Sequence, residues 1–255
     1  MIKEYAKQMV SLLFLLSGIA LSSSAQKQQV WKPFYDKCRR EKSIIDAIPT
    51  ELEKALHWSP TINKEQKAVI RYILWNMIYV EGNSINMGEN NDVPVTVGSF
   101  FINRYEVSQD EWYVIMGNNP SNQHKRDFPV DQINWYDARR FTQRLSELSG
   151  LPFRLPFEAE WEYAARGGLN TKNFIYSGSN NPEQVAWFRE KYNNNYVSKE
   201  TGRKEPNELG LYDMSGNVYE WCMDWYDKKV PFTGNIDPDL GGKDMHKVLR
   251  GGSYY

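Results

Sequence analysis

Cysteine and histidine, the usual ligands of soft and redox-active metals, are scarce in this sequence of 255 residues. The three histidines, His57, His124 and His246, stand far apart and at no metal-ligand spacing. A site built from closely spaced histidines is therefore not predicted, and each histidine is interpreted as a solvated or structural residue. The only two cysteines are Cys38 and Cys222. They form either one disulfide, if the chain reaches an oxidising compartment, or two separate buried thiols.

An excess of positive charge is also absent. The sequence has 31 Lys and Arg against 32 Asp and Glu, which gives a formal net charge of -1. A nucleic-acid-binding protein shows a basic patch or stripe that neutralises phosphates. No such footprint exists here, so nucleic acid is excluded as a partner. A composition of 41% hydrophobic and 25% charged residues is typical of a globular chain with a substantial core.

No apolar run is long enough to span a membrane, which takes about 20 residues. The longest runs from Val10 to Leu21, follows two lysines, and precedes the small residues Ser22-Ser23-Ser24-Ala25. This order is typical of a secretory signal peptide. The sequence predicts a leader over residues 1–25, a mature protein that begins at Gln26, a periplasmic or secreted location, and no transmembrane segment after processing.

Aromatic residues are abundant at 14%, with 16 Tyr and 9 Trp. Such rings hold a loop-rich fold together by burying large areas, and they also stack on sugars at a surface. Packing is the commoner use, because large aromatic side chains are highly buried on average. Both uses remain open from the sequence.

Two regions follow the leader. Residues 26–76 form a helical extension, in which Asn63 and Gln66 make a capping pair before an apolar run that ends at Trp75. The extension either packs on the main domain or serves as a spacer or docking arm. Residues 77–255 form the main domain. Its expected strands lie at 78–80, 85–88, 95–97 and 100–102, and its expected helices run from Ser108 to Met116, from Asn134 to Leu148 and from Glu158 to Ala165.

The stretch "GLYDMSGNVYEW", from Gly210 to Trp221, has neither helical nor strand periodicity and is interpreted as a built loop. Asp213, Asn217 and Glu220 present oxygen atoms at spacings of four and three residues. Such oxygen-rich turns suit a hard cation such as Ca²⁺. The alternative is that these residues only close Asx turns and cap or pair locally.

Six phrases occur in one order: "INMGEN", "FFINRYEVSQDEW", "FPVDQINWYDARRF", "FRLPFEAEWEYAARGG", "GLYDMSGNVYEWCMDWY" and "VLRGGSYY". Together they resemble the sulfatase-modifying-factor family, which includes the formylglycine-generating enzymes. The resemblance covers roughly Met77 to Tyr255. It implies a single α+β domain, the formylglycine-generating-enzyme fold related to C-type lectins, with many loops and little regular structure.

The resemblance also implies a structural calcium site in the matching loop. Its ligands would be the side chains of Asp213 and Glu220 and the backbone carbonyls of Gly216 and Val218. The family's cleft maps to three further positions. These are Tyr219, where the family often has Trp, and Arg250 and Ser253 of the "RGGS" phrase.

In the resembling oxidases, a cysteine pair just after "RGGS" binds copper and activates oxygen. Here Tyr254 and Tyr255 follow instead, and neither Cys38 nor Cys222 matches the pair. Soft thiolates bind copper, whereas tyrosine oxygens do not replace them, so copper and catalysis are not expected. One interpretation is a non-catalytic, calcium-supported binding or assembly module of the cell envelope, with a protein or glycan ligand. The alternative is a formylglycine-generating oxidase whose catalytic C-terminal segment is missing from this chain.

Phe157 departs from the family at the position where a Thr usually caps the "EAEWEYAAR" helix. Loss of such a cap costs about 1 kcal/mol unless another contact compensates. In the same helix, Glu158, Glu160 and Glu162 are not expected to act as paired catalytic carboxylates, because residues two apart point to different helix faces. Trp161 and Trp221 are both predicted to be buried core residues.

Overall fold

The computed structural model describes residues 10–11, 15–16, 55–88, 93–189, 191–192, 195–226 and 246–255. Cys38 and the helical stretch expected around it lie outside these ranges. Among the residues described, no helix has the length and apolar character needed to cross a membrane.

The three main-domain helices expected from the sequence are present, and the helix expected before residue 77 precedes them. The elements are α4 (Lys64–Trp75), α5 (Gln109–Met116), α6 (Trp135–Ser149) and α7 (Glu158–Ala165), followed by the short η2 (Gly168–Asn170) and α8 (Pro182–Val185). Capping boxes start α4, α5 and α6 at Asn63, Ser108 and Asn134. Left-handed glycines end α5 and α6 at Gly117 and Gly150. These boundaries were predictable because the capping chemistry is local.

The strands are short and belong to several small sheets. They are β1 (Val10–Ser11), β2 (Leu15–Leu16), β3 (Met77–Val80), β4 (Asn83–Met87), β5 (Val93–Val97), β6 (Phe100–Asn103), β7 (Phe153–Arg154), β8 (Lys191–Tyr192), β9 (Asn195–Tyr196), β10 (Tyr219–Tyr226) and β11 (His246–Arg250). The strand orders are β1-β10-β11, β3-β6-β2-β7, β4-β5 and β8-β9. Small sheets with long connections make this an α+β fold, as the sequence predicts.

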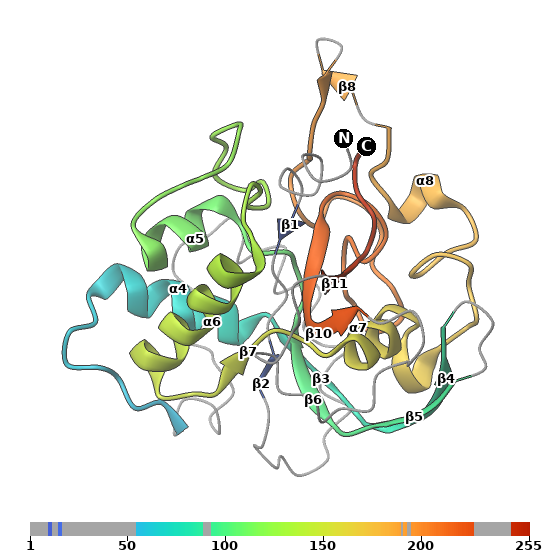
Figure 1. Cartoon of the computed structure of the whole chain (residues 1–255), viewed down its shortest axis with the longest axis horizontal. Coiled ribbons are helices and arrows are strands. Elements are labelled where there is room, and N and C mark those ends of the chain that lie inside the picture. Colours follow the sequence, from blue (N-terminus) through green and yellow to red (C-terminus); the bar gives the residue numbers. More distant parts are fainter. Residues whose placement is uncertain are drawn as a thin grey trace.

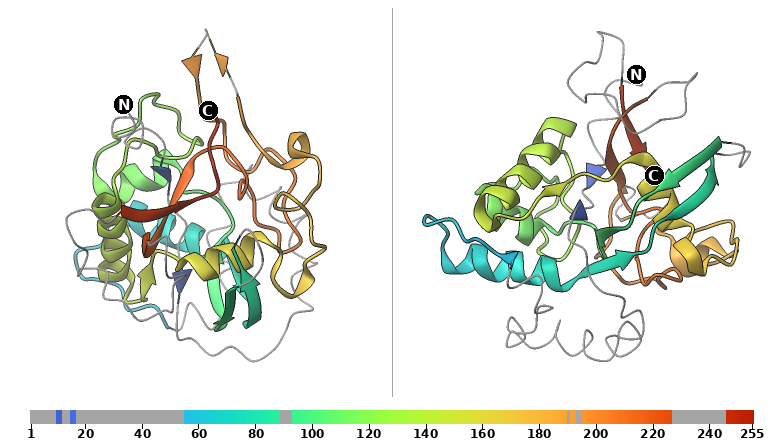
Figure 2. Two further views of the ribbon diagram at one scale, coloured as in Figure 1. Left: turned by 45° about the vertical axis from the view of Figure 1, so that its right-hand side comes forward. Right: turned by 90° about the horizontal axis from the view of Figure 1, so that it is seen from below.

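The elements divide into two groups around the β10–β11 ribbon. Figure 1 shows α4, α5 and α6 gathered on one side of the ribbon, and α7, α8 and the β4–β5 hairpin on the other. The β8–β9 hairpin stands at the tip of a loop that projects from the body (Figure 2). The ribbon therefore lies at the centre of the described structure.

One sequence interpretation is wrong in part. The stretch Gly210–Trp221 was expected to be loop throughout, but its last three residues begin the eight-residue strand β10. Tyr219, Trp221 and Met223 are half-buried, while Glu220, Cys222 and Asp224 are buried. Burial thus alternates along β10, as expected for a strand. The alternation is hard to recognise in the sequence because two of the buried residues, Glu220 and Asp224, are acidic.

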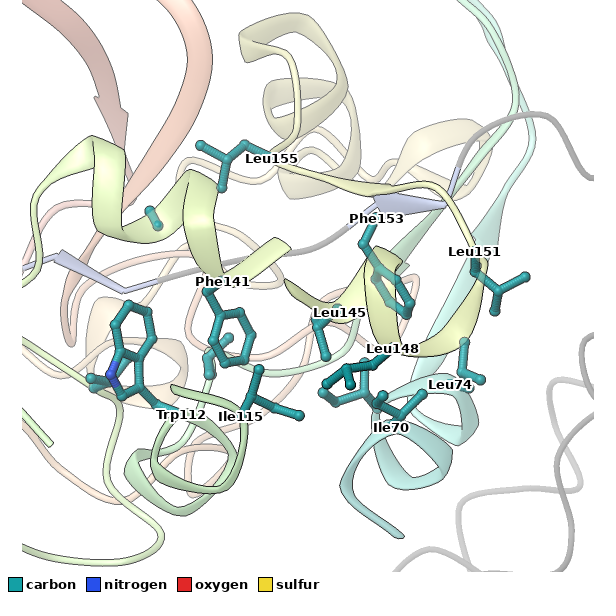
Figure 3. Packing of buried hydrophobic residues seen from close by; sticks show 14 of the residues in the cluster. Ile70, Leu74, Trp112, Ile115, Phe141, Leu145, Leu148, Leu151, Phe153 and Leu155 are labelled. Carbon is teal, nitrogen blue, oxygen red and sulfur yellow. The ribbon is translucent and has the colours of Figure 1, made fainter. Parts of the chain in front are cut away.

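Two large apolar clusters form most of the core, and a small third one contains Val218 and Tyr254. Figure 3 shows the first, in which Ile70 and Leu74 of α4 meet Trp112 of α5 and Phe141 and Leu145 of α6. The Trp112 and Phe141 rings stack with centroids 5.0 Å apart. The second cluster joins strands β3 and β6 to α7 and β10. Helix α4 is thus an integral part of the core rather than a detached arm.

The two tryptophans predicted as core differ in burial. Trp161 of α7 is 5% exposed and belongs to the second cluster. Trp221 of β10 is only half-buried and packs against the first cluster from outside. The prediction is therefore correct for Trp161 and too strong for Trp221.

Candidate functional site

The loop before β10 has an unusual backbone. Asp213, Gly216 and Asn217 have positive φ angles of 58°, 94° and 57°. Asp and Asn tolerate this left-handed region better than most residues. A Cβ on Gly216 would lie 2.4 Å from the carbonyl oxygen of Trp187, so no other residue fits there. The same Trp187 carbonyl accepts a hydrogen bond of 2.9 Å from the amide of Asn217.

The "RGGS" phrase is hydrogen-bonded to this loop. The amide of Gly216 donates to the carbonyl of Gly251 at 2.7 Å, and the amide of Tyr254 donates to the carbonyl of Asn217 at 2.7 Å. Two stretches about 35 residues apart in the sequence are thereby held together by backbone bonds, which side-chain substitutions leave in place. The loop and the end of β11 form one unit.

Three carboxylates are buried beside the loop. Asp213, Glu220 and Glu106 are 2%, 0% and 1% exposed. The amide of Gly202 donates to Asp213 Oδ2 at 2.6 Å, and the indole nitrogen of Trp161 donates to Glu220 Oε2 at 2.8 Å.

Glu106, which lies just after β6, is hydrogen-bonded to the loop. Its two carboxylate oxygens accept hydrogen bonds from the Asn217 side-chain amide at 2.6 Å and from the Val218 backbone amide at 3.2 Å. Asn217 completes the connection, because its Oδ1 accepts from the amide of Lys199 at 2.9 Å. Asn217 is therefore a structural link in the loop.

Burial and neighbouring negative charge raise the pKa values of two of these carboxylates, Glu106 and Glu220. Burial raises the pKa of Glu106 well above its ordinary value, and the charges of Asp213 and Glu220 raise it further. Burial, together with the charge of Asp213, raises the pKa of Glu220 to about 8, against the opposing hydrogen bond from Trp161. Negative charge gathered in a buried place is costly unless a cation or a proton compensates it.

The donor set fits a hard cation. Glu220 Oε1 is a fully buried oxygen with no hydrogen-bond partner, and such an orphan needs an explanation. Asp213 would supply a second carboxylate, and Gly216 and Val218 would supply backbone carbonyls of the kind that Ca²⁺ accepts. In the described part of the chain, no three His, Cys, Asp or Glu side chains are arranged to hold a metal together. A cation at this loop would accordingly depend on the carbonyls for part of its coordination.

The three cleft positions have different surroundings. Tyr219 is half-buried and packs against Val218 and Tyr254. Ser253 is half-buried, and its hydroxyl accepts a hydrogen bond from the amide of Tyr255. Arg250 forms ion pairs with two acids: its Nε lies 2.9 Å from Glu158 Oε1, and its Nη2 pairs with Glu162 Oε2. The arginine therefore joins β11 to α7.

Among the described residues, which include Cys222 but not Cys38, no pair of thiols is available for a copper-thiolate centre. Cys222 is a free, fully buried thiol. Burial raises its pKa well above the ordinary value, and the charge of Asp224 raises it further. A reactive or copper-binding cysteine needs the thiolate form. His57, His124 and His246 are all exposed and lie in separate parts of the chain, and in the described structure no metal-holding cluster includes any of them.

Sequence reasoning missed two members of the site. Glu106 lies in the stretch "FFINRYEVSQDEW", where its neighbours in the sequence do not indicate its partners. Its signal is a lone acid between the apolar residues Tyr105 and Val107, a pattern that indicates a buried carboxylate. The second is Trp161, whose hydrogen bond to Glu220 joins residues 59 positions apart. No local sequence pattern predicts this contact.

Residues 71–255 match the sulfatase-modifying factor enzyme 1-like domain family. The chain belongs to this family. The match begins inside α4, the helix that also packs into the core. It includes the candidate loop and the "RGGS" phrase.

Relatives that carry different names share this sequence pattern. The chaperone protein LppX of Paenibacillus barcinonensis is 35% identical, with 59% of this chain and 72% of that protein covered. A formylglycine-generating enzyme of Streptomyces coelicolor is 33% identical, with 49% of this chain and 42% of the enzyme covered. The chain thus spans less than half the length of that enzyme.

Solved structures confirm the formylglycine-generating-enzyme fold. Treponema denticola variable protein 1 has a TM-score of 0.52 and 28% identity, with 70% of this chain and 83% of that chain covered. The predicted fold class is confirmed.

Proposed function

We propose that this protein is an exported, non-catalytic member of its family, in which calcium supports a binding or assembly module of the cell envelope. The observation that carries the proposal is Glu220 Oε1, a fully buried carboxylate oxygen without a hydrogen-bond partner beside two further buried carboxylates. A divalent cation at Asp213 and Glu220 would supply the missing partner and offset the repulsion. The carbonyls of Gly216 and Val218 would complete its coordination.

Calcium in this role holds the loop and does no chemistry. Its charge would hold the side chains of Asp213 and Glu220 in place. The loop is in turn hydrogen-bonded to the residues after β11, from Gly216 to Gly251 and from Tyr254 to Asn217, so these residues would also be held in place. The half-buried Tyr219 and Ser253 lie in the same region. They are the positions at which a protein or glycan ligand would make contact.

The non-catalytic part of the proposal is supported by thiol chemistry. Copper-dependent oxidation in the resembling enzymes needs a pair of thiolates, and this chain has one buried thiol at Cys222 and a second cysteine at position 38. The relative named a chaperone provides separate support for a binding or assembly role.

Peptide mass spectrometry tests the non-catalytic role. The purified chain is incubated with a peptide containing Cys-x-Pro-x-Arg, oxygen and a reductant, with and without added copper. The formylglycine-generating enzyme of Streptomyces coelicolor serves as the active control. We expect no conversion of the peptide cysteine by this chain. Conversion that disappears in Cys222→Ser would overturn the proposal and identify the protein as an oxidase.

A further inference from the structure

The two carboxylate oxygens of Glu220 have different surroundings. Oε2 accepts a hydrogen bond of 2.8 Å from the indole nitrogen of Trp161. Oε1 has no hydrogen-bond partner among the described residues, although Glu220 is 0% exposed. A buried carboxylate oxygen without a partner loses its bonds to water without replacement. Oε1 is therefore the oxygen that remains for a cation, whereas Oε2 already has a partner.

Gly251 borders the space that Oε1 faces. A Cβ on Gly251 would lie 3.9 Å from Glu220 Oε1, 3.7 Å from the carbonyl oxygen of Val218 and 3.6 Å from Cζ2 of Trp161. Because glycine has no side chain, Gly251 does not fill this space itself. Two of the candidate ligand oxygens thus lie beside one small space, and the ring of Trp161 lies at its edge.

The indole of Trp161 is held in place by its surroundings. Trp161 lies on α7, is 5% exposed and belongs to the second apolar cluster. The guanidinium carbon of Arg250 lies 5.8 Å from the centroid of its ring. Arg250 is in turn paired with Glu158 and Glu162 of the same helix. A buried ring packed in this way directs its N–H at one partner, so Trp161 determines where Oε2 of Glu220 lies.

The number of oxygens that a carboxylate offers affects which cation it prefers. Ca²⁺ takes roughly six to eight oxygen ligands in flexible geometry and accepts a carboxylate through one oxygen or both, whereas Mg²⁺ demands a near-ideal octahedron. The two oxygens of one carboxylate lie too close together to fill two corners of that octahedron. Freeing both oxygens of Glu220 would accordingly favour Ca²⁺ over Mg²⁺.

We propose that Trp161 is a positioning residue of the calcium loop: its N–H holds Glu220 Oε2 and so restricts Glu220 to one cation-facing oxygen, Oε1. This restriction limits the preference of the loop for Ca²⁺ over Mg²⁺. The inference rests on the proposed function, because it concerns the cation that the loop binds. Trp161 thereby has two roles, as a core residue and as a determinant of cation selectivity.

An isostere of tryptophan tests the role of the N–H alone. Benzothienylalanine has the shape of tryptophan but carries sulfur in place of the ring N–H, and it is introduced at position 161 of the full chain. Calorimetric titration measures the Kd values for Ca²⁺ and Mg²⁺ in the wild type and in this variant. We expect the ratio of the Mg²⁺ Kd to the Ca²⁺ Kd to rise roughly tenfold in the variant, the size of effect common when a metal ligand loses its hydrogen-bond partner.

The matched control is the same replacement at Trp112. Its indole nitrogen also donates to a side-chain oxygen, Asn118 Oδ1 at 3.2 Å, and Trp112 is 2% exposed, but it belongs to the first apolar cluster. Loss of a hydrogen bond should lower the Tm of both variants. Only the replacement at Trp161 should change the cation ratio, because a purely structural effect acts on the binding of both cations alike.

A measurement on the wild type applies even if the variant does not fold. Nuclear magnetic resonance follows hydrogen exchange of the Trp161 indole N–H with and without Ca²⁺, with the Trp112 indole as the comparison. We expect the Trp161 N–H to stay protected when Ca²⁺ is bound, because Oε2 remains its acceptor. Loss of that protection on Ca²⁺ binding would mean that Glu220 turns both oxygens to the cation, and it would overturn the proposal.

The outcomes separate this inference from the proposed function. If the wild type binds Ca²⁺ and the cation ratio is the same in the Trp161 variant, the positioning role is rejected and the calcium loop remains. An equal change of the ratio in the Trp112 variant also rejects the positioning role, because the effect then does not depend on Glu220. A wild type that does not bind Ca²⁺ rejects the proposed function and the inference with it.

Discussion

Asp224 of β10 caps helix α7 from another element. Its Oδ2 accepts a hydrogen bond of 2.6 Å from the amide of Glu158, the first residue of the helix. The helix's own N-cap, Phe157, has no side-chain oxygen, and its ring instead packs under the Arg154 guanidinium at 4.6 Å. The first amide of α7 thus finds its acceptor in an acid 66 residues away, while the N-cap residue itself contributes no side-chain acceptor.

Replacement of Asp224 should lower the stability of α7, since the amide of Glu158 loses its acceptor. We expect Asp224→Ala to reduce the free energy of unfolding by about 1–2 kcal/mol. Adding Phe157→Thr should recover part of that loss by restoring a local cap, whereas adding Phe157→Ala should recover none. Urea denaturation measures all three. Equal effects of Thr and Ala at position 157 would show that Asp224 acts through something other than capping.

Arg250 should be a structural residue rather than a ligand contact. Arg250→Met removes a cation from Glu158 and from the buried Glu162, and removing one partner of a buried pair costs about 3–5 kcal/mol, less where a second cation remains. Arg166 still contacts Glu162 at 2.6 Å, so we expect about 2–3 kcal/mol.

The matched control is Arg126→Met, which breaks a solvent-exposed pair with Asp110 and should leave the free energy of unfolding almost unchanged. Thermal and urea unfolding compare the two variants. If both variants are as stable as the wild type, Arg250 is free to serve a ligand and the structural assignment is wrong.

Glu111 should make stability depend on pH. Burial raises its pKa from 4.5 to about 7, although hydrogen bonds from Ser108 oppose the shift. Because the folded pKa lies above the unfolded pKa, the stabilisation is complete below pH 4.5 and is lost as the pH rises through about 7.

Glu111→Gln keeps a side-chain oxygen for Ser108 but stays neutral. The variant should match the wild type near about pH 4 and exceed its free energy of unfolding by about 1–3 kcal/mol near about pH 8. Urea denaturation across this range measures the difference. Parallel curves for the two proteins would indicate that Glu111 ionises normally.

The sequence predicted those features that local chemistry determines. The capping pairs at Asn63, Ser108 and Asn134 located three helices to within a residue or two, and glycines placed two of their ends. The α+β fold and the family followed from six phrases in order. These features depend on residues a few positions apart.

What the sequence did not predict depends on distant contacts. Asp224 and Trp161 act on partners 66 and 59 positions away. The strand β10 was interpreted as loop at its start because acids occupy its buried side. Glu106 was not assigned because only the fold brings it beneath Asn217. The predictions of a cleaved leader, of calcium and of an envelope ligand remain to be tested.

Calcium titration of the wild type and Glu220→Gln tests the central claim most directly. In a chelator, the Gln variant should be at least as stable as the wild type, because it removes a buried charge that Asp213 and Glu106 repel. With Ca²⁺ at about 100 times its Kd, the wild type should gain about 2.7 kcal/mol and the variant much less, so the order of their Tm values should reverse. A wild-type Tm that does not respond to Ca²⁺, or an equal rise in both proteins, would contradict a calcium site at Asp213 and Glu220.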